Sequence, residues 1–405
     1  MPDFLARQVL SFEACWAIFL LTVFLKGIEM KDLLELRNEI DQIDNEIVSL
    51  FEQRMHISEQ VAQYKIRTGK KVFDKERESE KLKTLSSKAS NEFIRHGIWE
   101  LFEQIMSVSR KKQYQLLGAE GMLEKPDFTK VDRLVEKKPT VVFQGVEGAY
   151  SQQAMQQFFS EQHDSFHVET WRDAMEAIRR KQADFAVLPL ENSSAGIVSE
   201  NYDLLAEYDA YIVGEQVLKI DHALLGLANA DETEIRTVYS HPQALMQCSK
   251  YLEEHKEWEE ISLKNTAVSA QKVKQDANVH QAAIASPVTA ELYGLKVIKE
   301  GIQDNQTNCT RFVIVTADPV YQKDARHIAL CLELPHTVGS LYHTLSHFIY
   351  NNINMINIQS RPKPDKNWEY RFFIDIEGNL EDEGVQNALG GLKEETSFLK
   401  ILGTY

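Results

Sequence analysis

Two cations lie on the apolar face of a helix predicted near the N-terminus. From Leu33 to Tyr64 the apolar residues recur at alternating steps of three and four, as in a coiled-coil seam, and Arg54 takes one of these positions. Lys65 follows eleven residues later, about three helical turns, so both side chains point in nearly the same direction. Because a buried cation needs an anionic partner, the pattern predicts a bound anion between helices. Structural salt bridges to neighbouring carboxylates are the alternative.

More polar side chains share this helical segment. In its last predicted helix, Ser109 and Gln113 continue an inward apolar stripe at steps of four, and each would cost about 1–3 kcal/mol if left unpaired. Arg37 projects about 100° away from Arg54 on the helical wheel, so we expect it to serve a different pocket, that of a partner subunit. Taken together, these residues favour a dianion bound in a common core.

The long helix also predicts an oligomer. It runs from about Lys31 to Arg67 and would be roughly 55 Å long, whereas a domain of under about 100 residues is only about 30 Å across. The seam is therefore too long to be buried inside one chain. We expect a second copy to cover it in an intertwined helical dimer.

Polar clusters follow several predicted strands in the middle of the chain. Small-molecule sites of α/β sheets form beyond strand ends, where these clusters fall. They are Glu191–Ser194, Ser240–Gln247, Asn265–Ala267 and Asn308–Phe312. Helix caps and turns are the alternative for each cluster, because Ser, Thr and Asn favour those positions. A glycine turn at Gly145–Ser151 lacks the spacing of a phosphate or dinucleotide loop.

Composition limits the class of function. The chain has 405 residues, of which 43% are hydrophobic and 26% charged, enough for two or three domains. A formal net charge of −16 argues against nucleic-acid and anionic-membrane partners, but not against small anionic substrates. The four cysteines lack zinc or disulfide spacing, so we expect reduced thiols in a cytoplasmic protein, with Cys309 a bystander.

The histidines do not form a metal motif. His343 and His347 are spaced i, i+4 without a third ligand nearby in the sequence, so we expect a solvated helix face. His241 precedes Pro242 and is expected to be a turn residue rather than an acid or base. We therefore expect neither a metal nor another cofactor.

The N-terminal residues 1–29 differ from the remainder. The run Ala14–Leu25 is apolar, but it is too short to span a bilayer comfortably and makes a poor signal peptide. Met30 directly precedes the amphipathic helix. We expect residues 1–29 to be a disordered appendage or a start-site artefact, with a membrane anchor as the alternative.

The remaining periodicities predict a multidomain protein. An all-α helical domain covers residues 30–118, a charged linker 119–139, an α/β domain 140–320 and an α+β domain 326–405. The α/β domain alternates helical stretches with five short β-rich runs: Thr140–Gln144, Phe185–Leu190, Thr237–Ser240, Ala282–Ala285 and Phe312–Thr316. The last domain has the ferredoxin-like order βαββαβ, with elements expected at His327–Leu334, Gly339–Tyr350, Ile353–Ser360, Trp368–Glu377, from about Glu381, and at Phe398–Leu402.

The helical segment from Leu33 to Gln113 resembles the chorismate mutases that are fused to prephenate dehydratases. The resemblance implies an intertwined dimer and a complete set of substrate-site residues. This set comprises three arginines, a lysine, an acidic pair and a Ser/Gln pair: Arg37, Arg54, Arg77, Lys65, Asp74, Glu78, Ser109 and Gln113.

The implied chemistry suits these residue types. Chorismate rearranges to prephenate in a pericyclic step, which requires a dicarboxylate held in its reactive conformer and charge stabilised at the ether oxygen. The resemblance implies that Arg37 and Arg54 hold the carboxylates. Lys65 and Gln113 would donate to the ether oxygen, and Glu78 would accept from the substrate hydroxyl.

The segment from about Thr140 to Val315 resembles prephenate dehydratase, and Thr310-Arg311-Phe312 is its most specific motif. The resemblance implies two α/β lobes with the site between them. Thr310 would protonate the departing hydroxyl while decarboxylation aromatises the ring. Four further residues would bind the substrate: Asn192, Ser240, Gln247 and Arg311.

The C-terminal domain resembles an ACT domain, a module that pairs across a dimer and binds amino acids. Gly339-Ser340-Leu341 stands where Gly-Ala-Leu is usual, and Gln359-Ser360-Arg361-Pro362 where Glu-Ser-Arg-Pro is usual. The glutamine removes a carboxylate that could contact an effector ammonium group. The implied effector is phenylalanine, and a dimerisation unit without a ligand is the alternative.

These resemblances imply a bifunctional enzyme that converts chorismate to prephenate and prephenate to phenylpyruvate in phenylalanine biosynthesis, under phenylalanine feedback. One alternative is an arogenate dehydratase. Another is a solute-binding sensor with a helical dimerisation domain, although a dimerisation domain does not need Arg54 and Lys65 on its seam.

Overall fold

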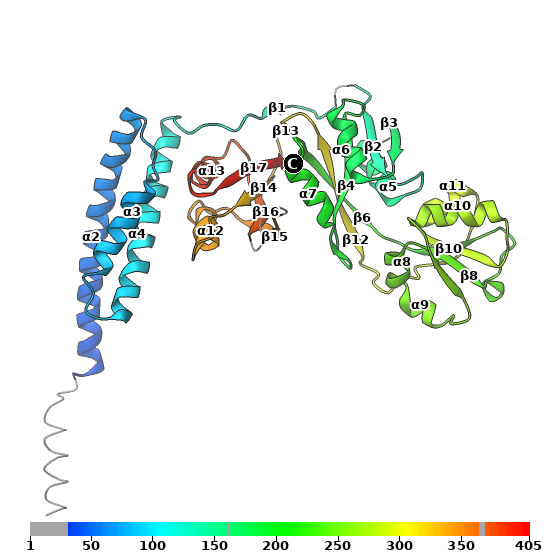
Figure 1. Ribbon diagram of the computed structural model, residues 1–405, viewed down its shortest axis with the longest axis horizontal. Coiled ribbons are helices and arrows are strands. Elements are labelled where there is room, and N and C mark those ends of the chain that lie inside the picture. Colours follow the sequence, from blue (N-terminus) through cyan, green and yellow to red (C-terminus); the bar gives the residue numbers. More distant parts are fainter. Residues whose placement is uncertain (1–30, 136, 161–162, 364–368) are drawn as a thin grey trace, which may run out of the picture. The chain divides into compact units, whose positions relative to one another are not determined.

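The structure is a computed structural model that describes residues 31–135, 137–160, 163–363 and 369–405 (Figure 1). The chain divides after Thr68 into two compact units. The apolar run Ala14–Leu25 lies outside the described residues. Within the described ranges, no helix is long and apolar enough to cross a membrane.

The described part of the first unit is one helix, α2 (Leu33–Thr68), of 36 residues. It confirms the long helix predicted here. Its apolar seam is exposed in the single chain, where Ile43 exposes 56% and Leu50 64% of its surface. An apolar stripe of this length is typical of a surface that another protein covers.

Two helices begin the second unit, α3 (Lys75–Ser86) and α4 (Glu92–Ala119). Gly69 follows α2 with a φ of +65°, a conformation that favours glycine. The side chains of Asp74 and Asn91 cap α3 and α4 by accepting from backbone N–H groups of the first turn. A new helix begins after each of these capping residues, which accounts for the two breaks in the helical pattern.

The first lobe of the α/β region is a mixed sheet. Its strands are β2 (Thr140–Gln144), β3 (Asp164–Val168), β4 (Phe185–Asn192), β5 (Gly196–Ile197), β6 (Tyr211–Lys219) and β12 (Cys309–Thr316). β2 lies parallel to β3 and β4, and β12 lies antiparallel between β4 and β6. Helices α6 (Trp171–Arg179) and α7 (Ser199–Glu207) pack on one face, and α5 (Tyr150–Phe159) packs on the other.

The second lobe has a five-stranded sheet in the order β11-β7-β10-β8-β9. Its strands are β7 (Ala223–Gly226), β8 (Thr237–Ser240), β9 (Glu259–Ser262), β10 (Gln281–Ala285) and β11 (Lys296–Glu300). Its helices are η1 (Glu232–Glu234), α8 (Pro242–Gln247), α9 (Ser249–Glu253), α10 (Thr266–Asp276) and α11 (Pro287–Tyr293). The chain crosses between the lobes at residues 220–222 and 301–308. The prediction of a two-lobed α/β domain is thus confirmed.

The C-terminal elements follow the order βαββαβ. They are β14 (His327–Glu333), α12 (Ser340–Tyr350), β15 (Met355–Pro362), β16 (Tyr370–Glu377), α13 (Glu383–Glu395) and β17 (Phe398–Thr404). The strands pair antiparallel in the order β15-β16-β14-β17.

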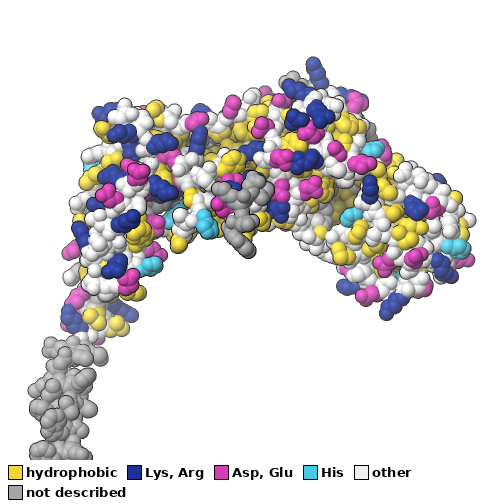
Figure 2. Space-filling view, in the orientation of Figure 1, with side chains coloured by type: hydrophobic (Ala, Val, Ile, Leu, Met, Phe, Trp, Pro, Cys, Tyr) yellow, Lys and Arg dark blue, Asp and Glu magenta, His cyan; other side chains and the backbone are white. Residues whose placement is uncertain are grey.

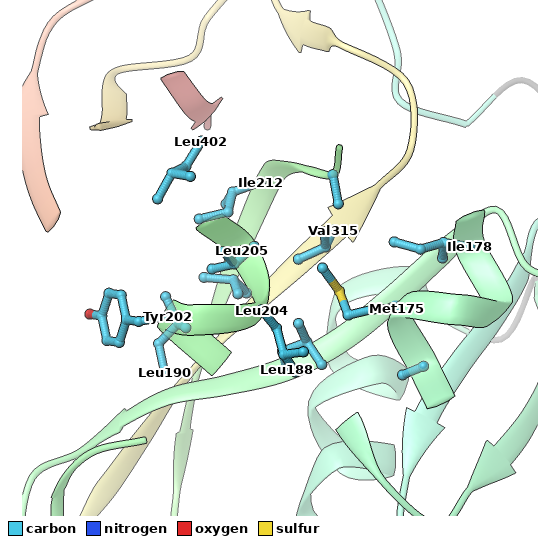
Figure 3. Packing of buried hydrophobic residues seen from close by; sticks show 14 of the residues in the cluster. Met175, Ile178, Leu188, Leu190, Tyr202, Leu204, Leu205, Ile212, Val315 and Leu402 are labelled. Atoms are coloured by element: carbon cyan, nitrogen blue, oxygen red, sulfur yellow. The ribbon is translucent and has the colours of Figure 1, made fainter. Parts of the chain in front are cut away.

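The C-terminal elements share one sheet and one core with the first lobe. β17 pairs with β6 at Gly403 and Ile212, which extends the sheet to ten strands. A Cβ atom at Gly403 would lie 2.0 Å from the Ile212 carbonyl oxygen, so only glycine fits. Leu402 packs in the same cluster as Ile212 and Leu205 (Figure 3). The C-terminal part is therefore attached to the first lobe by packing as well as by the chain.

Residues 119–139 are more structured than predicted. Within them, β1 (Thr129–Val131) pairs parallel with β13 (Val320–Gln322). Phe128 also packs edge-on against Tyr211, with ring centroids 5.2 Å apart. A short strand whose partner lies far along the chain leaves no periodicity in the sequence, so this strand was not predicted within the linker.

The surface charge agrees with the composition. On the face shown in Figure 2, Lys and Arg side chains are interspersed with Asp and Glu, without a continuous basic area. This matches the formal net charge of −16.

Candidate active sites

Asn192 and Thr310 lie side by side at the end of the first lobe. They are paired in the register of β4 and β12. The Asn192 amide nitrogen donates to Thr310 Oγ1 at 2.9 Å and to Asn308 Oδ1 at 2.9 Å. Two of the four predicted polar clusters therefore meet in one place.

The orientation of the Asn192 amide is fixed by the backbone. Its Oδ1 accepts from the N–H groups of Ser194 and Ala195 at 3.0 and 2.8 Å, so its nitrogen must face Thr310. Thr310 Oγ1 consequently accepts a hydrogen bond. Its own hydroxyl hydrogen can then be donated to a bound molecule.

Gln247 brings the second lobe to this pair. It ends α8, and its Nε2 lies 3.4 Å from Asn192 Oδ1. The predicted site residues Asn192, Gln247 and Thr310 are thus assembled from both lobes.

The predicted glycine turn also lies where the lobes meet. Gly145 and Gly148 have φ values of +120° and +88°. The Gly148 carbonyl accepts from the Thr289 hydroxyl at 3.0 Å, and a Cβ at Gly145 would lie 3.6 Å from Asn265 Nδ2. The backbone conformation favours glycine at both positions, and at Gly148 a Cβ would also lie only 3.2 Å from Leu292 of the second lobe.

Ser240 differs from its predicted role in substrate binding. Its side chain is completely buried at the end of β8, and its hydroxyl donates to the Ile284 carbonyl at 2.6 Å. A side chain without exposed surface does not touch a ligand in this conformation. Ser240 therefore connects two strands of the second lobe.

Arg311 also differs from its predicted role. Its guanidinium donates to Glu215 at 2.8 Å and to Asp375 at 2.9 Å, and it contacts the Tyr405 hydroxyl. Successive residues of a strand point to opposite faces, so Arg311 points away from the face of Thr310. Arg311 was predicted to bind a substrate carboxylate. Its guanidinium instead forms ion pairs with Glu215 of β6 and with Asp375 of the C-terminal strand β16.

Two other predicted features act as helix caps. Asn265 accepts from the Val268 N–H at 2.8 Å and caps α10. His241 Nδ1 accepts from the Gln243 N–H at 3.1 Å and caps α8, in agreement with a turn residue. Burial lowers the pKa of His241.

The predicted mutase residues are divided between the two units. Helix α2 carries Arg37, which is exposed, and Arg54 and Lys65, which are half-buried. The second unit carries the other five: Asp74, Arg77, Glu78, Ser109 and Gln113.

On α3 and α4 the mutase residues have local partners. Ser109 and Gln113 are buried on α4, and the Gln113 amide donates to the Ser109 carbonyl at 3.2 Å. The Glu78 carboxylate forms an ion pair with Arg110. Asp74 accepts from the Arg77 N–H at 3.1 Å as the cap of α3.

Comparison with known proteins identifies both enzymatic regions. A family model of chorismate mutase type II matches residues 36–114, and one of prephenate dehydratase matches residues 141–320. The bifunctional chorismate mutase/prephenate dehydratase of Aquifex aeolicus is 31% identical over 378 residues, covering 93% of this chain and 98% of that protein. The Escherichia coli K12 protein of the same name is 32% identical over 380 residues, covering 92% and 96%. This chain belongs to the bifunctional chorismate mutase/prephenate dehydratase family.

A solved structure supports the dehydratase fold. The prephenate dehydratase from Arthrobacter aurescens, in complex with L-Phe, aligns with a TM-score of 0.61 and 28% identity, over 66% of this chain and 89% of that one. The resemblances of the sequence to chorismate mutase and to prephenate dehydratase are confirmed. The enzyme therefore has both chorismate mutase and prephenate dehydratase activity.

A buried charged cluster joins the mutase helices to the C-terminal elements, and the sequence analysis missed it. Arg110 of α4 donates to Glu395 of α13 at 2.7 Å, and His347 Nε2 lies 3.2 Å from Glu395. Burial alone would raise the pKa of Glu395, but His347 and Arg110 outweigh it and lower the pKa to about 2. Nearby, the Lys111 ammonium group donates to the Ser346 hydroxyl at 2.7 Å. Burial lowers the pKa of Lys111 to about 8. Arg110 follows Ser109 directly, but nothing in the sequence shows that α13 packs there.

This packing overturns the prediction for His343 and His347. His347 is completely buried, and His343 Nε2 lies 3.4 Å from Glu103 of α4. The face of α12 predicted to be solvated is covered because α4 and α13 pack on it. Among the described residues, no group of three or more His, Cys, Asp or Glu side chains is arranged to hold a metal ion.

The two predicted effector motifs lie toward the same end of the C-terminal sheet. Arg361 of β15 pairs in register with Arg371 of β16, and Arg371 pairs with Glu333 at the end of β14. The chain then continues from Glu333 to Gly339 and α12, so both motifs lie at this end of the sheet. Gly339 has a φ of +80°. Ser340 Oγ donates to the Pro335 carbonyl at 2.6 Å. The remaining members of the motifs occupy the start of α12 and the end of β15: Leu341, Gln359, Ser360 and Pro362.

Proposed function

We propose that the dehydratase reaction takes place at Thr310. Thr310 Oγ donates its hydrogen to the departing C4 hydroxyl of prephenate, which leaves as water while the ring carboxylate leaves as CO₂ and its bonding electrons aromatise the ring. The Thr310 alkoxide then regains a proton from solvent water. The observation that carries this assignment is the hydrogen bond from the Asn192 amide to Thr310 Oγ1 at 2.9 Å. A donor to Oγ makes the hydroxyl more acidic and directs its hydrogen away from Asn192.

Gln247 and Asn192 orient prephenate beside Thr310 in this proposal. The Gln247 amide nitrogen can donate its second hydrogen to a carboxylate or carbonyl oxygen of the substrate, and Asn192 positions both Gln247 and Thr310 through the hydrogen bonds described above. The contact between Gln247 and Asn192 supports a site shared by the two lobes.

For the mutase we propose a second, separate site. Arg37, Arg54 and Arg77 would hold the two carboxylates of chorismate, and Asp74 and Ser109 would help to bind it. Lys65 and Gln113 would donate to the ether oxygen as charge develops there, and Glu78 would accept from the ring hydroxyl. The ion pair between Arg110 and Glu78 supports an ionised carboxylate at Glu78.

We also propose a homodimer or larger homo-oligomer in which a second copy covers the seam of α2. The exposed apolar side chains of that seam support this assembly. Arg37 would then complete the neighbouring mutase site.

The C-terminal elements are proposed to form a ferredoxin-like ACT domain at residues 326–405 that binds L-phenylalanine as a feedback effector. The βαββαβ order and the shared location of the two motifs support the proposal. So does the Arthrobacter aurescens prephenate dehydratase, whose structure contains L-Phe. The mutase and dehydratase domains would span 30–118 and 140–320.

A cytoplasmic location completes the proposal. Buried thiols at Cys248 and Cys331 are unpaired, as is typical of reducing compartments.

The assignment of two sites is tested by incubating the purified full chain with chorismate and following the products by NMR. Phenylpyruvate should accumulate without added cofactor. Accumulation of prephenate alone would contradict the dehydratase site or its substrate. Competing prephenate against arogenate then distinguishes a prephenate dehydratase from an arogenate dehydratase.

A further inference from the structure

His222 lies between the two lobes, in the first crossover of the chain. Its side chain is 2% exposed, and its backbone N–H donates to Gln303 Oε1 of the second crossover at 3.0 Å. The sequence analysis did not select it, because it adjoins none of the predicted polar clusters.

Both ring nitrogens of His222 have defined partners. Nε2 lies 2.9 Å from Gln247 Oε1, and Nδ1 lies 3.0 Å from the hydroxyl oxygen of Tyr150, whose single hydrogen is within reach of both Nδ1 and the Asp221 carbonyl. Gln247 Oε1 can only accept, so Nε2 carries the hydrogen of the ring. Burial lowers the pKa of His222, which favours this neutral form.

The contact fixes the side-chain amide of Gln247. With Oε1 held by His222, the Gln247 amide nitrogen is directed toward Asn192 Oδ1, 3.4 Å away. Asn192 in turn donates to Thr310 Oγ1. A continuous series of hydrogen bonds therefore connects His222 with the hydroxyl proposed to protonate the substrate.

We propose that His222 is a positioning residue of the dehydratase site. It holds the Gln247 side chain in the orientation in which the Gln247 amide nitrogen faces Asn192 and prephenate. The proposal rests on the roles assigned above to Thr310, Asn192 and Gln247. It also explains why a histidine, rather than an apolar residue, is buried in the crossover.

Two substitutions of His222 distinguish the roles of its two ring nitrogens. In His222→Gln the amide nitrogen can take the place of Nε2 and donate to Gln247. In His222→Asn the shorter side chain reaches only the place of Nδ1, beside Tyr150, and the bond to Gln247 is lost. Tyr150→Phe is the matched control, because it removes the Tyr150 hydroxyl and leaves the bond to Gln247.

The dehydratase kcat and KM are measured with prephenate, and the mutase rate of the same preparations reports folding. We expect His222→Asn to lower kcat by about 10- to 100-fold, the scale of a misplaced binding group. His222→Gln and Tyr150→Phe should stay within about threefold of the parent, and the mutase rate should not change.

Equal kcat values for His222→Asn and His222→Gln, whether both high or both low, would overturn the proposal, since a structural role does not distinguish the two nitrogens. Gln247→Leu tests the assumption that Gln247 itself contributes to the dehydratase site. Full activity of Gln247→Leu would contradict the proposed site itself, whereas a loss in Gln247→Leu without a loss in His222→Asn would contradict only the role of His222.

Discussion

At the scale of residues, the proposed dehydratase mechanism depends on how one hydroxyl is polarised. Thr310 is a weak acid by itself, and in this proposal the hydrogen bond from the Asn192 amide at 2.9 Å prepares it to donate. The sequence placed both residues in polar clusters, but the bond between them required the register of β4 and β12.

Replacing Thr310 by alanine should abolish the dehydratase and spare the mutase. Losing such a donor costs roughly 10²–10³ in rate, and Thr310→Ser should recover part of it because it keeps the hydroxyl. Both rates are measured on each variant with chorismate and prephenate as separate substrates. Loss of both activities in Thr310→Ala would contradict two independent sites.

Lys65→Ala is the complementary change. Removing the cation proposed for the ether oxygen should lower the mutase kcat by roughly 10²–10³, because charge develops there only in the transition state. The dehydratase rate with prephenate should remain that of the parent. Lys70→Ala, which removes a cation outside the predicted set, is the control, and a similar mutase loss in it would argue for a general charge effect.

At the scale of elements, the register of one strand decides which neighbours of Thr310 reach the site. Arg311 is adjacent in sequence, yet it pairs with Glu215 and Asp375 on the other face of β12. Short motifs do not reveal such a difference, since alternation assigns opposite faces only once the strand is known.

The packing of α13 on α4 predicts a pH-dependent stability. The pKa of Glu395 is lowered to about 2 in the folded chain, so its ionised form stabilises the fold above its ordinary pKa, and this contribution is lost as the pH falls from about 5 toward 2. Glu395→Gln should cost about 1–3 kcal/mol at pH 7, because it removes one of the two carboxylates, Glu395 and Glu78, that pair with the buried Arg110.

Urea unfolding at pH 7 and pH 3 measures both effects. The difference in stability between Glu395→Gln and the parent should be large at pH 7 and smaller at pH 3. Glu381→Gln is a suitable control, because Glu381 pairs with Lys130 at an exposed position and should change stability by at most about 1 kcal/mol. A difference independent of pH would contradict the ionised state of Glu395.

At the scale of the whole molecule, the exposed seam of α2 is the surface on which we propose that a second copy binds. Ile43→Glu places a charge on that seam, and burying an unpaired charge costs several kcal/mol. The dimer dissociation constant should rise by at least about 100-fold, with loss of mutase activity at low protein concentration and retention of the dehydratase. Sedimentation velocity measures the assembly, and Glu46→Gln serves as the control. A dimer of unchanged affinity in Ile43→Glu would contradict this use of the seam.

The C-terminal part is a further feature of the whole molecule. It continues the sheet of the first lobe through Gly403 and contacts the mutase helices through Arg110 and Glu395. Its element order could be read from periodicity, but its position could not, because each of these contacts joins residues far apart in the sequence.

The sequence by itself predicted the long helix, five strands of the α/β region and the βαββαβ order of the C-terminal elements, since hydrophobic period is a local property, but it missed other strands of the α/β region such as β3, β6 and β11. It also placed Asn192, Gln247 and Thr310 in polar clusters, and the resemblance to prephenate dehydratase selected them from those clusters. Only the tertiary structure decided that Ser240 is buried, that Arg311 faces the C-terminal elements, that His347 lies inside an interface and that His222 holds Gln247. Burial and hydrogen-bond partners depend on which distant segments pack together, and that information is absent from local pattern.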